Sequence, residues 1–472
     1  MKKLILDNYC YKKFFQDEKL VNRFTKLKDF SINGKVKKED FSVYIGHKIQ
    51  NTDYNLQYIL CDEIKYINEC IEFIGGHHPF VCALNKAYND FLRSDMKVLL
   101  YLGKFPGYGK DIDGGSILAK QLIDTLKKRC KLDVAFIRKN NEIYVNNYIK
   151  NVFYYRYKDA LNNKFIRRLK NLDTNIEALK DFEKYDKVVT AHVSKFFGCD
   201  FGESFWKKTI LFPMFCTHSY QRAGEFVPIE YSKQECNVLQ SVNKIITPSI
   251  EEKQDLISEY LISEDKINVI YRGIDTHIHF RIRKSCGDEI NLICIGSIKK
   301  QKNNIMQLEL LNKLIKNGIR VKLHLVTTIQ EKEIYDEMLH YILINNLDKY
   351  IIFHISILQE ELASLLELCD INISTSNWET FGRGIFEGIS AGLPTLINNK
   401  LTVIHTIVGN NIGVKYLNTI DDFFYEIIKL REPVYYCKCS SALKSILHKV
   451  SYKLEQNKLA DAILGIDNNE IN

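Results

Sequence analysis

Short apolar runs alternate with longer amphipathic stretches in this sequence, and the alternation starts twice. It begins with Val98–Leu102 and restarts with Asn291–Ile295, after a polar link near Arg281. In both places the apolar runs have the length of buried strands, and the stretches after them have the period of helices. Strand-first alternation predicts parallel sheets covered by helices. We therefore expect an α/β fold with two similar domains, and an active site in the cleft between them.

The length of the chain leaves room for a further segment before these two domains. The chain has 472 residues, of which 46% are hydrophobic, enough for two or three domains. We expect an appended N-terminal extension over residues 1–95, a first Rossmann-like domain over 96–280 and a second over 281–472, which ends in helices. The extension lacks the strand-first alternation. Its apolar period predicts that it is helical, with a helix over Asn55–Phe73.

Two glycines precede the first helix of the first domain. Gly114 and Gly115 stand just before the helix expected over Ser116–Lys128. They lack the G-x-G-x-x-G spacing, so an ordinary dinucleotide fingerprint is not supported. Glycines at the start of a helix still allow a ligand to approach the backbone closely.

Two histidines follow apolar runs of the same domain. Lys187–His192 and Ile210–Ser219 read as strands that end at or near His192 and His218. A single histidine is more often structural than catalytic. Two at the carboxyl ends of neighbouring parallel strands are more informative, because ligands bind at that edge of a sheet.

The second domain contains a strand, a tight loop and a short helix with two carboxylates. Ile371–Ser374 reads as a buried strand, and a helix is expected over Gly382–Ala391. The first turn of such a helix has unpaired N–H groups that attract phosphate. Glu379 and Glu387 flank this seat. Because carboxylates repel phosphate, we expect them to accept hydrogen bonds from hydroxyl groups, which are abundant in sugars.

A lysine-rich loop follows the first strand of the second domain. Lys302 lies in this loop, at the same expected edge as Glu379, where it could neutralise a diphosphate. The alternative is a solvated basic loop without a ligand. A diphosphate site is favoured, because the loops that carry Lys302 and Glu379 follow strands at the same expected edge of the sheet.

Together these residues resemble the retaining glycosyltransferases of family four, which have the GT-B fold. The resemblance extends from Lys97 to the C-terminus and is strongest where Glu379 and Glu387 are separated by seven residues. Supporting matches are Phe381-Gly382, Gly392-Leu393-Pro394, Gly114-Gly115, Thr247-Pro248-Ser249, Gly273-Ile274-Asp275, Lys302-Asn303 and Val408–Gly413. Thr190–Glu225 is similar to the corresponding part of the sucrose-synthesising branch, which is not evidence for sucrose chemistry.

The resemblance implies transfer of a hexosyl or N-acetylhexosaminyl group, with retention, from a nucleotide diphosphate sugar such as a UDP-sugar. The acceptor would be a hydroxyl of a glycan or a lipid-linked saccharide, as in polysaccharide biosynthesis. The implied catalytic residues are Glu379, His192 and Lys302. The implied donor-binding residues are Gly114, Gly115, Ser297, Lys302, Phe381, Gly382 and Glu387, with Glu387 on the ribose and Lys302 on the diphosphate.

One position departs from the family pattern. Ser297 stands where the family usually has an arginine that works with the lysine, and Lys299 or Lys300 could take its place. This departure keeps two alternatives open, a binding or scaffold protein without turnover and a GT-B epimerase or phosphorylase. The paired glutamates favour transfer.

Partners and location follow from composition. The sequence has no metal-ligand cluster, so we expect neither a metal nor another cofactor. The formal charge of +8 is diffuse, which argues against nucleic acid. Thirteen cysteines without a C-x-x-C pair indicate reduced thiols, and no apolar run reaches the length of a membrane helix. We expect a cytoplasmic protein. The basic stretch Lys164–Lys170 is a solvated helix face or a peripheral contact with anionic lipid at the inner membrane face.

Overall fold

The structure is a computed structural model that describes most of the two large domains and four strands before them. The described residues are 2–6, 30–32, 42–46, 56–60, 96–102, 114–127, 129–136, 179, 182–197, 199, 201–214, 216–222, 224–329 and 331–465. Within them, none of the helices is both long and apolar enough to cross a bilayer.

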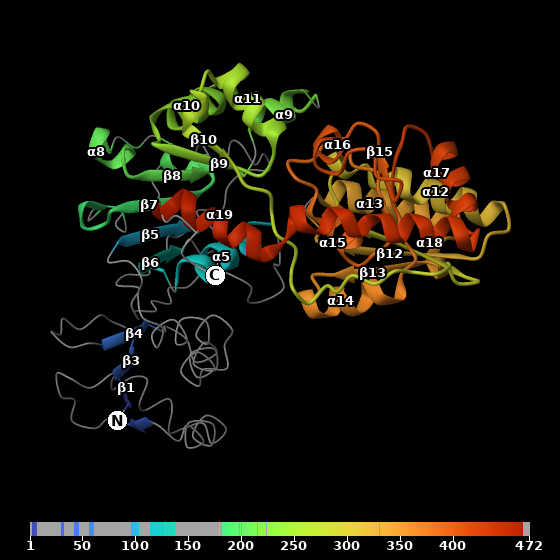
Figure 1. The fold of residues 1–472 in the computed structure, drawn as a ribbon, viewed down its shortest axis with the longest axis horizontal. Coiled ribbons are helices and arrows are strands. Elements are labelled where there is room, and N and C mark those ends of the chain that lie inside the picture. Colours follow the sequence, from blue (N-terminus) through green and yellow to red (C-terminus); the bar gives the residue numbers. More distant parts are fainter. Residues whose placement is uncertain are drawn as a thin grey trace.

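The first domain is built on a parallel sheet of six described strands in the order β10-β9-β8-β7-β5-β6 (Figure 1). These strands are β5 (Lys97–Leu102), β6 (Lys131–Phe136), β7 (Lys187–Ala191), β8 (Thr209–Phe212), β9 (Lys244–Thr247) and β10 (Ile267–Val269). Its α-helices are α5 (Gly114–Leu126), α8 (Gly202–Trp206), α9 (Thr217–Arg222), α10 (Ile229–Ser241) and α11 (Ile250–Tyr260). Short 3-10 helices are η3 (Phe182–Lys184), η4 (Val193–Phe196) and η5 (Glu264–Lys266).

The second domain has a parallel six-stranded sheet in the order β13-β12-β11-β14-β15-β16. Its strands are β11 (Ile290–Ile295), β12 (Val321–Thr327), β13 (Ile351–Ile355), β14 (Ile371–Ser374), β15 (Thr395–Asn398) and β16 (Val414–Leu417). Its helices are η6 (Lys300–Lys302), α12 (Asn304–Lys316), α13 (Lys332–Ile344), η7 (Asp348–Tyr350), α14 (Gln359–Leu368), α15 (Arg383–Ser390), α16 (Thr402–Val408), α17 (Ile420–Leu430), α18 (Pro433–Ala442), η8 (Leu443–Val450) and α19 (Tyr452–Leu464). The two sheets with their helices confirm the predicted α/β fold.

Both sheets have a point where the strand order reverses, and ligands bind beside the carboxyl ends of the strands at such a point. In the second sheet the order follows the Rossmann pattern, and the reversal lies between β11 and β14. In the first sheet it lies between β5 and β7. A ligand is therefore expected to bind beside the loops that follow β5, β7, β11 and β14.

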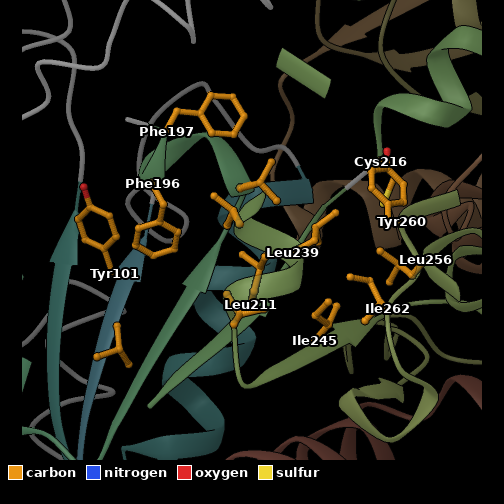
Figure 2. Close-up of a cluster of buried hydrophobic side chains, with 14 of the residues drawn as sticks. Tyr101, Phe196, Phe197, Leu211, Cys216, Leu239, Ile245, Leu256, Tyr260 and Ile262 are labelled. Atoms are coloured by element: carbon orange, nitrogen blue, oxygen red, sulfur yellow. The ribbon is translucent and has the colours of Figure 1, made fainter. Parts of the chain in front are cut away.

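The core of the first domain lies directly beneath one of these loops. The turn after β7 carries Phe196 and Phe197, both fully buried (Figure 2). Phe197 meets the Tyr231 ring edge-on at 4.8 Å, and Phe196 meets Trp206 at 5.4 Å. Burying a side chain of this size contributes about 1.5–3 kcal/mol. Two such anchors fix the turn that begins with His192.

The last helix returns from the second domain to the first. In Figure 1 the red helix α19 lies beside α5, and the two are in contact. The Tyr452 hydroxyl donates to Asp124 of α5 at 3.0 Å, and the Ile274 N–H donates to the Val450 carbonyl at 2.9 Å. The two domains are thus joined by the chain crossing near residue 274 and by α19.

The described residues of the extension correct one prediction. They form parallel strands β1 (Lys2–Leu6), β2 (Phe30–Ile32), β3 (Ser42–Gly46) and β4 (Leu56–Leu60), in the order β2-β1-β3-β4. The helical interpretation is wrong for these residues, including the start of the helix predicted over Asn55–Phe73. A short apolar run fits a strand as well as a helix turn, and β3 is rich in residues that favour strands.

A second correction concerns the strand predicted over Ile210–Ser219. It ends at Phe212, and His218 lies in α9 instead of at a strand end. Pro213 lacks the N–H that a central strand needs, and Met214 has a φ of 71°, so the chain turns there. The basic stretch Lys164–Lys170 lies outside the described residues.

Candidate active site

An ion pair lies at the switch point of the second sheet. Lys302, in the short helix after β11, donates from Nζ to Oε1 of Glu379, in the loop after β14. The two side chains are 16% and 11% exposed, so water screens the pair only partly. The lysine stem packs beside Gly296, where a Cβ would lie in ordinary contact, 3.4 Å from Lys302 Cε.

Backbone contacts hold the two loops together. The Gln301 side chain donates to the Trp378 carbonyl at 2.7 Å, and the Asn377 N–H donates to the Gln301 carbonyl at 2.9 Å. The Thr375 hydroxyl lies 3.0 Å from the carbonyls of both Lys302 and Asn303. These bonds fix Lys302 and Glu379 before any ligand arrives.

Helix α15 begins beside this pair. Its N-cap, Gly382, has a φ of 83°, a conformation that glycine adopts without strain. A Cβ on Gly384 would lie only 2.4 Å from the Ile295 carbonyl oxygen, so the first turn packs directly on the end of β11. Phe381 is buried and stacks on Phe386 at 4.7 Å. The N–H groups of the first turn are thereby held at the edge where an anion would bind.

Glu387 lies one turn inside α15. It is 3% exposed, and its Oε1 accepts from Nε of Arg383 at 3.1 Å. Burial raises the pKa of Glu387, while the Arg383 charge opposes this rise and the Asp275 charge adds to it. A buried carboxylate with one cationic partner is a strong acceptor for hydroxyl groups.

The position of the missing family arginine is occupied by a hydroxyl pair. Ser297 accepts a hydrogen bond from the Thr328 hydroxyl at 3.2 Å. Of the two lysines suggested as substitutes, Lys299 is half-buried just before the helix that carries Lys302, and Lys300 is exposed.

His192 and the glycine pair come from the first domain. His192 directly follows β7, at that sheet's switch point, and has a φ of 82°. Its Nδ1 accepts from the Ser194 N–H at 3.2 Å, which places the proton of the neutral ring on Nε2. Gly114 and Gly115 form the first turn of α5 rather than preceding it. The helix that they open joins β5 to β6, so it begins on the same edge of the sheet as His192.

The loop that carries Glu379 also touches the first domain. The Trp378 ring meets the Tyr220 ring of α9 edge-on at 4.8 Å and packs on the first domain's core. A second contact joins the domains, because the Thr406 hydroxyl of α16 donates a hydrogen bond to the Glu251 carboxylate of α11. The site therefore lies where the two domains meet.

Three residues of the site were missed in the sequence, namely Gln301, Thr375 and Arg383. Gln301 and Thr375 act through contacts between distant loops, for which the sequence gives no local signal. Arg383 could have been found, because it stands four residues before Glu387 on one helix and carries the opposite charge.

Comparisons with known proteins agree with this geometry. Residues 275–430 match the family model described as "Glycosyl transferases group 1". This segment is similar to the group 1 glycosyl transferases. It contains the ion pair, α15 and Glu387. No curated protein sequence matches the chain.

Solved structures show the same two-domain fold at low identity. The HepE protein of Anabaena, in complex with UDP and glucose, is 12% identical with a TM-score of 0.59, over 79% of this chain and 100% of HepE. The sucrose-phosphate synthase of Thermosynechococcus elongatus is 13% identical with a TM-score of 0.64, over 78% and 98%. WaaG, a glycosyltransferase involved in lipopolysaccharide biosynthesis, is 14% identical with a TM-score of 0.56, over 78% and 100%. The chain therefore has the GT-B fold.

Proposed function

We propose that the protein is a retaining glycosyltransferase that moves a hexosyl or N-acetylhexosaminyl group from a nucleotide diphosphate sugar to a hydroxyl acceptor. The observation that carries this proposal is the Lys302–Glu379 pair beside the first turn of α15, at the switch point of a Rossmann sheet. A cation, free N–H groups and a carboxylate in one place match a diphosphate joined to a sugar.

The donor would lie across this edge. Glu387 would accept hydrogen bonds from the ribose hydroxyls, and the first turn of α15 would bind the diphosphate. Lys302 would then exchange Glu379 for a phosphate oxygen, which frees Glu379 to bind hydroxyls of the sugar. UDP is our first choice of nucleotide, because HepE has been crystallised with UDP and with UDP-glucose.

Transfer requires stabilisation of a leaving diphosphate. The anomeric C–O bond breaks, negative charge grows on the diphosphate, and positive charge grows on the sugar ring. Fixed donors of this kind typically contribute about 3–4 kcal/mol to such a transition state. The acceptor oxygen bonds the anomeric carbon on the same face, and the departing phosphate oxygen takes its proton. His192, protonated on Nε2, would donate to a sugar hydroxyl from the first domain, near the N-terminus of α5 and its Gly114 and Gly115.

The remaining parts of the proposal concern the surroundings of the reaction. We propose a glycan or lipid-linked saccharide as acceptor, no metal or other cofactor, and a cytoplasmic location, with peripheral contact at the inner membrane face as the alternative. The nine cysteines of the described residues are free thiols, which suits a reducing compartment.

The proposal is tested by nucleotide release. Purified protein is incubated with UDP-, GDP- and ADP-sugars, with and without glycan acceptors, and free nucleotide and binding are measured together. Nucleotide release that depends on an acceptor supports transfer. Donor binding without any release would favour a binding or scaffold protein, the alternative that Ser297 motivates. If the protein neither binds a donor nor releases nucleotide, the proposed glycosyltransferase function is refuted.

A further inference from the structure

Arg383 lies between the candidate ribose carboxylate and the crossing between the domains. Its Nε donates to Glu387 Oε1 at 3.1 Å, and its Nη1 donates to the Gly273 carbonyl at 3.0 Å. The side chain is 17% exposed. One planar guanidinium therefore joins two groups that are far apart in the sequence.

Gly273 is a junction of three elements. Its carbonyl also accepts from the Gln121 side chain of α5 at 3.0 Å, and its N–H donates to Glu455 of α19 at 2.7 Å. The chain approaches α19 so closely that a Cβ on Gly273 would lie 2.4 Å from the Tyr452 Cα. Through Gly273, Arg383 is connected to α5 of the first domain and to α19, the helix that packs on α5.

We propose that Arg383 is a positioning residue, which holds the Glu387 carboxylate in place for the donor and ties it to the Gly273 carbonyl at the domain crossing. The proposal rests on the proposed role of Glu387 in binding the ribose. A bound ribose would then act on the crossing through one planar guanidinium.

The chemistry of arginine suits this task. The guanidinium presents donors in fixed directions, so it can hold a carboxylate and a carbonyl at once. A lysine would keep the charge next to Glu387 but could not keep both bonds in the same geometry. Other charged groups lie close by. The charge of Asp275 also acts on Glu387, and Arg272 and Glu455 form an ion pair beside Gly273.

The test is calorimetric titration with UDP-glucose and with UDP over a series of pH values. Arg383→Gln and Arg383→Lys are compared with wild type. Arg320→Gln, a largely exposed arginine of the same domain, is the control. We expect Arg383→Gln to weaken binding by about tenfold or more, since a charge-assisted bond is lost. The pH at which binding is half lost should rise, because Glu387 is protonated more easily without its cation. Arg383→Lys should restore that pH but not the full affinity.

A double variant separates positioning from general damage. If Arg383 acts through Glu387, adding Arg383→Gln to Glu387→Gln should weaken binding by less than about twofold. An equal loss in both backgrounds overturns the proposal, as does a fall in melting temperature with unchanged affinity and pH dependence. If wild type binds no nucleotide sugar, the proposed function itself fails. If wild type binds and Arg383→Gln behaves like Arg320→Gln, only the inference about Arg383 fails.

Discussion

Gly384→Ala tests whether close packing of α15 on β11 builds the donor site. The added Cβ would lie 2.4 Å from the Ile295 carbonyl oxygen and 2.8 Å from its Cβ. Ordinary contact begins near 3.4 Å, so the helix must move by about 1 Å. Overpacking of this kind costs about 1–3 kcal/mol, and alanine returns up to about 1 kcal/mol of helix propensity. Stability should therefore fall by no more than about 3 kcal/mol.

The effect on function should be larger. A displacement of about 1 Å in a positioned site can lower turnover by about a hundredfold. The matched control is Gly388→Ala on the same helix, whose Cβ would lie 2.4 Å from the Asn372 side chain of β14 instead of the end of β11. Melting temperature, donor affinity and turnover are measured for both variants. Wild-type donor affinity and turnover in Gly384→Ala would refute the reasoning, and so would equal losses in the two variants.

Three further predictions concern Lys302, Glu455 and Glu252, which is a buried residue of α11. Lys302→Ala should lower kcat by about a hundredfold, because the leaving diphosphate loses its cation. Steady-state kinetics check this, and an unchanged kcat would contradict it. Burial raises the pKa of Glu252 to about 7, although the Arg272 charge opposes the rise. The folded state therefore holds a proton that the unfolded state releases near pH 4.3, and stability should decline by about 4 kcal/mol between these pH values. Denaturant titrations should show that Glu252→Gln flattens this decline, and an unchanged slope would contradict the assignment. Glu455→Ala should cost about 3–5 kcal/mol, because Arg272 loses its buried partner; a calorimetric loss below about 1 kcal/mol would contradict it.

The second domain could be predicted closely because its local patterns agree with its tertiary structure. The strand expected over 371–374 has these bounds in the structure, and the helix expected over 382–391 spans 383–390. Amphipathic period, apolar strand length and Gly-Pro stops all point to the same elements there.

The two wrong element predictions have physical causes, because each of these segments has a sequence pattern that fits more than one structure. The run from Ile210 continues as apolar sequence past Pro213, so hydrophobicity alone extends the strand that the proline ends. In the extension, Leu56–Leu60 satisfies a strand as well as a helix turn, and pairing with β3 decides between them.

The site was partly predictable for the same reasons. Glu379, Glu387 and Lys302 stand at loop and helix positions whose spacing the sequence shows. The bonds of Arg383 and Glu455 to Gly273 join elements more than a hundred residues apart. Only folding brings these elements together, so no local sequence pattern could indicate the hydrogen bonds to Gly273.

The most direct test of the central claim is the binding of UDP to wild type, Glu387→Gln and Glu333→Gln, measured by calorimetry at neutral pH. Glu333 is an exposed residue of α13 and serves as the control. If Glu387 accepts the ribose hydroxyls, Glu387→Gln should bind UDP at least about tenfold more weakly, while Glu333→Gln binds as wild type does. UDP binding by Glu387→Gln with wild-type affinity would contradict the assignment of this edge as the donor site.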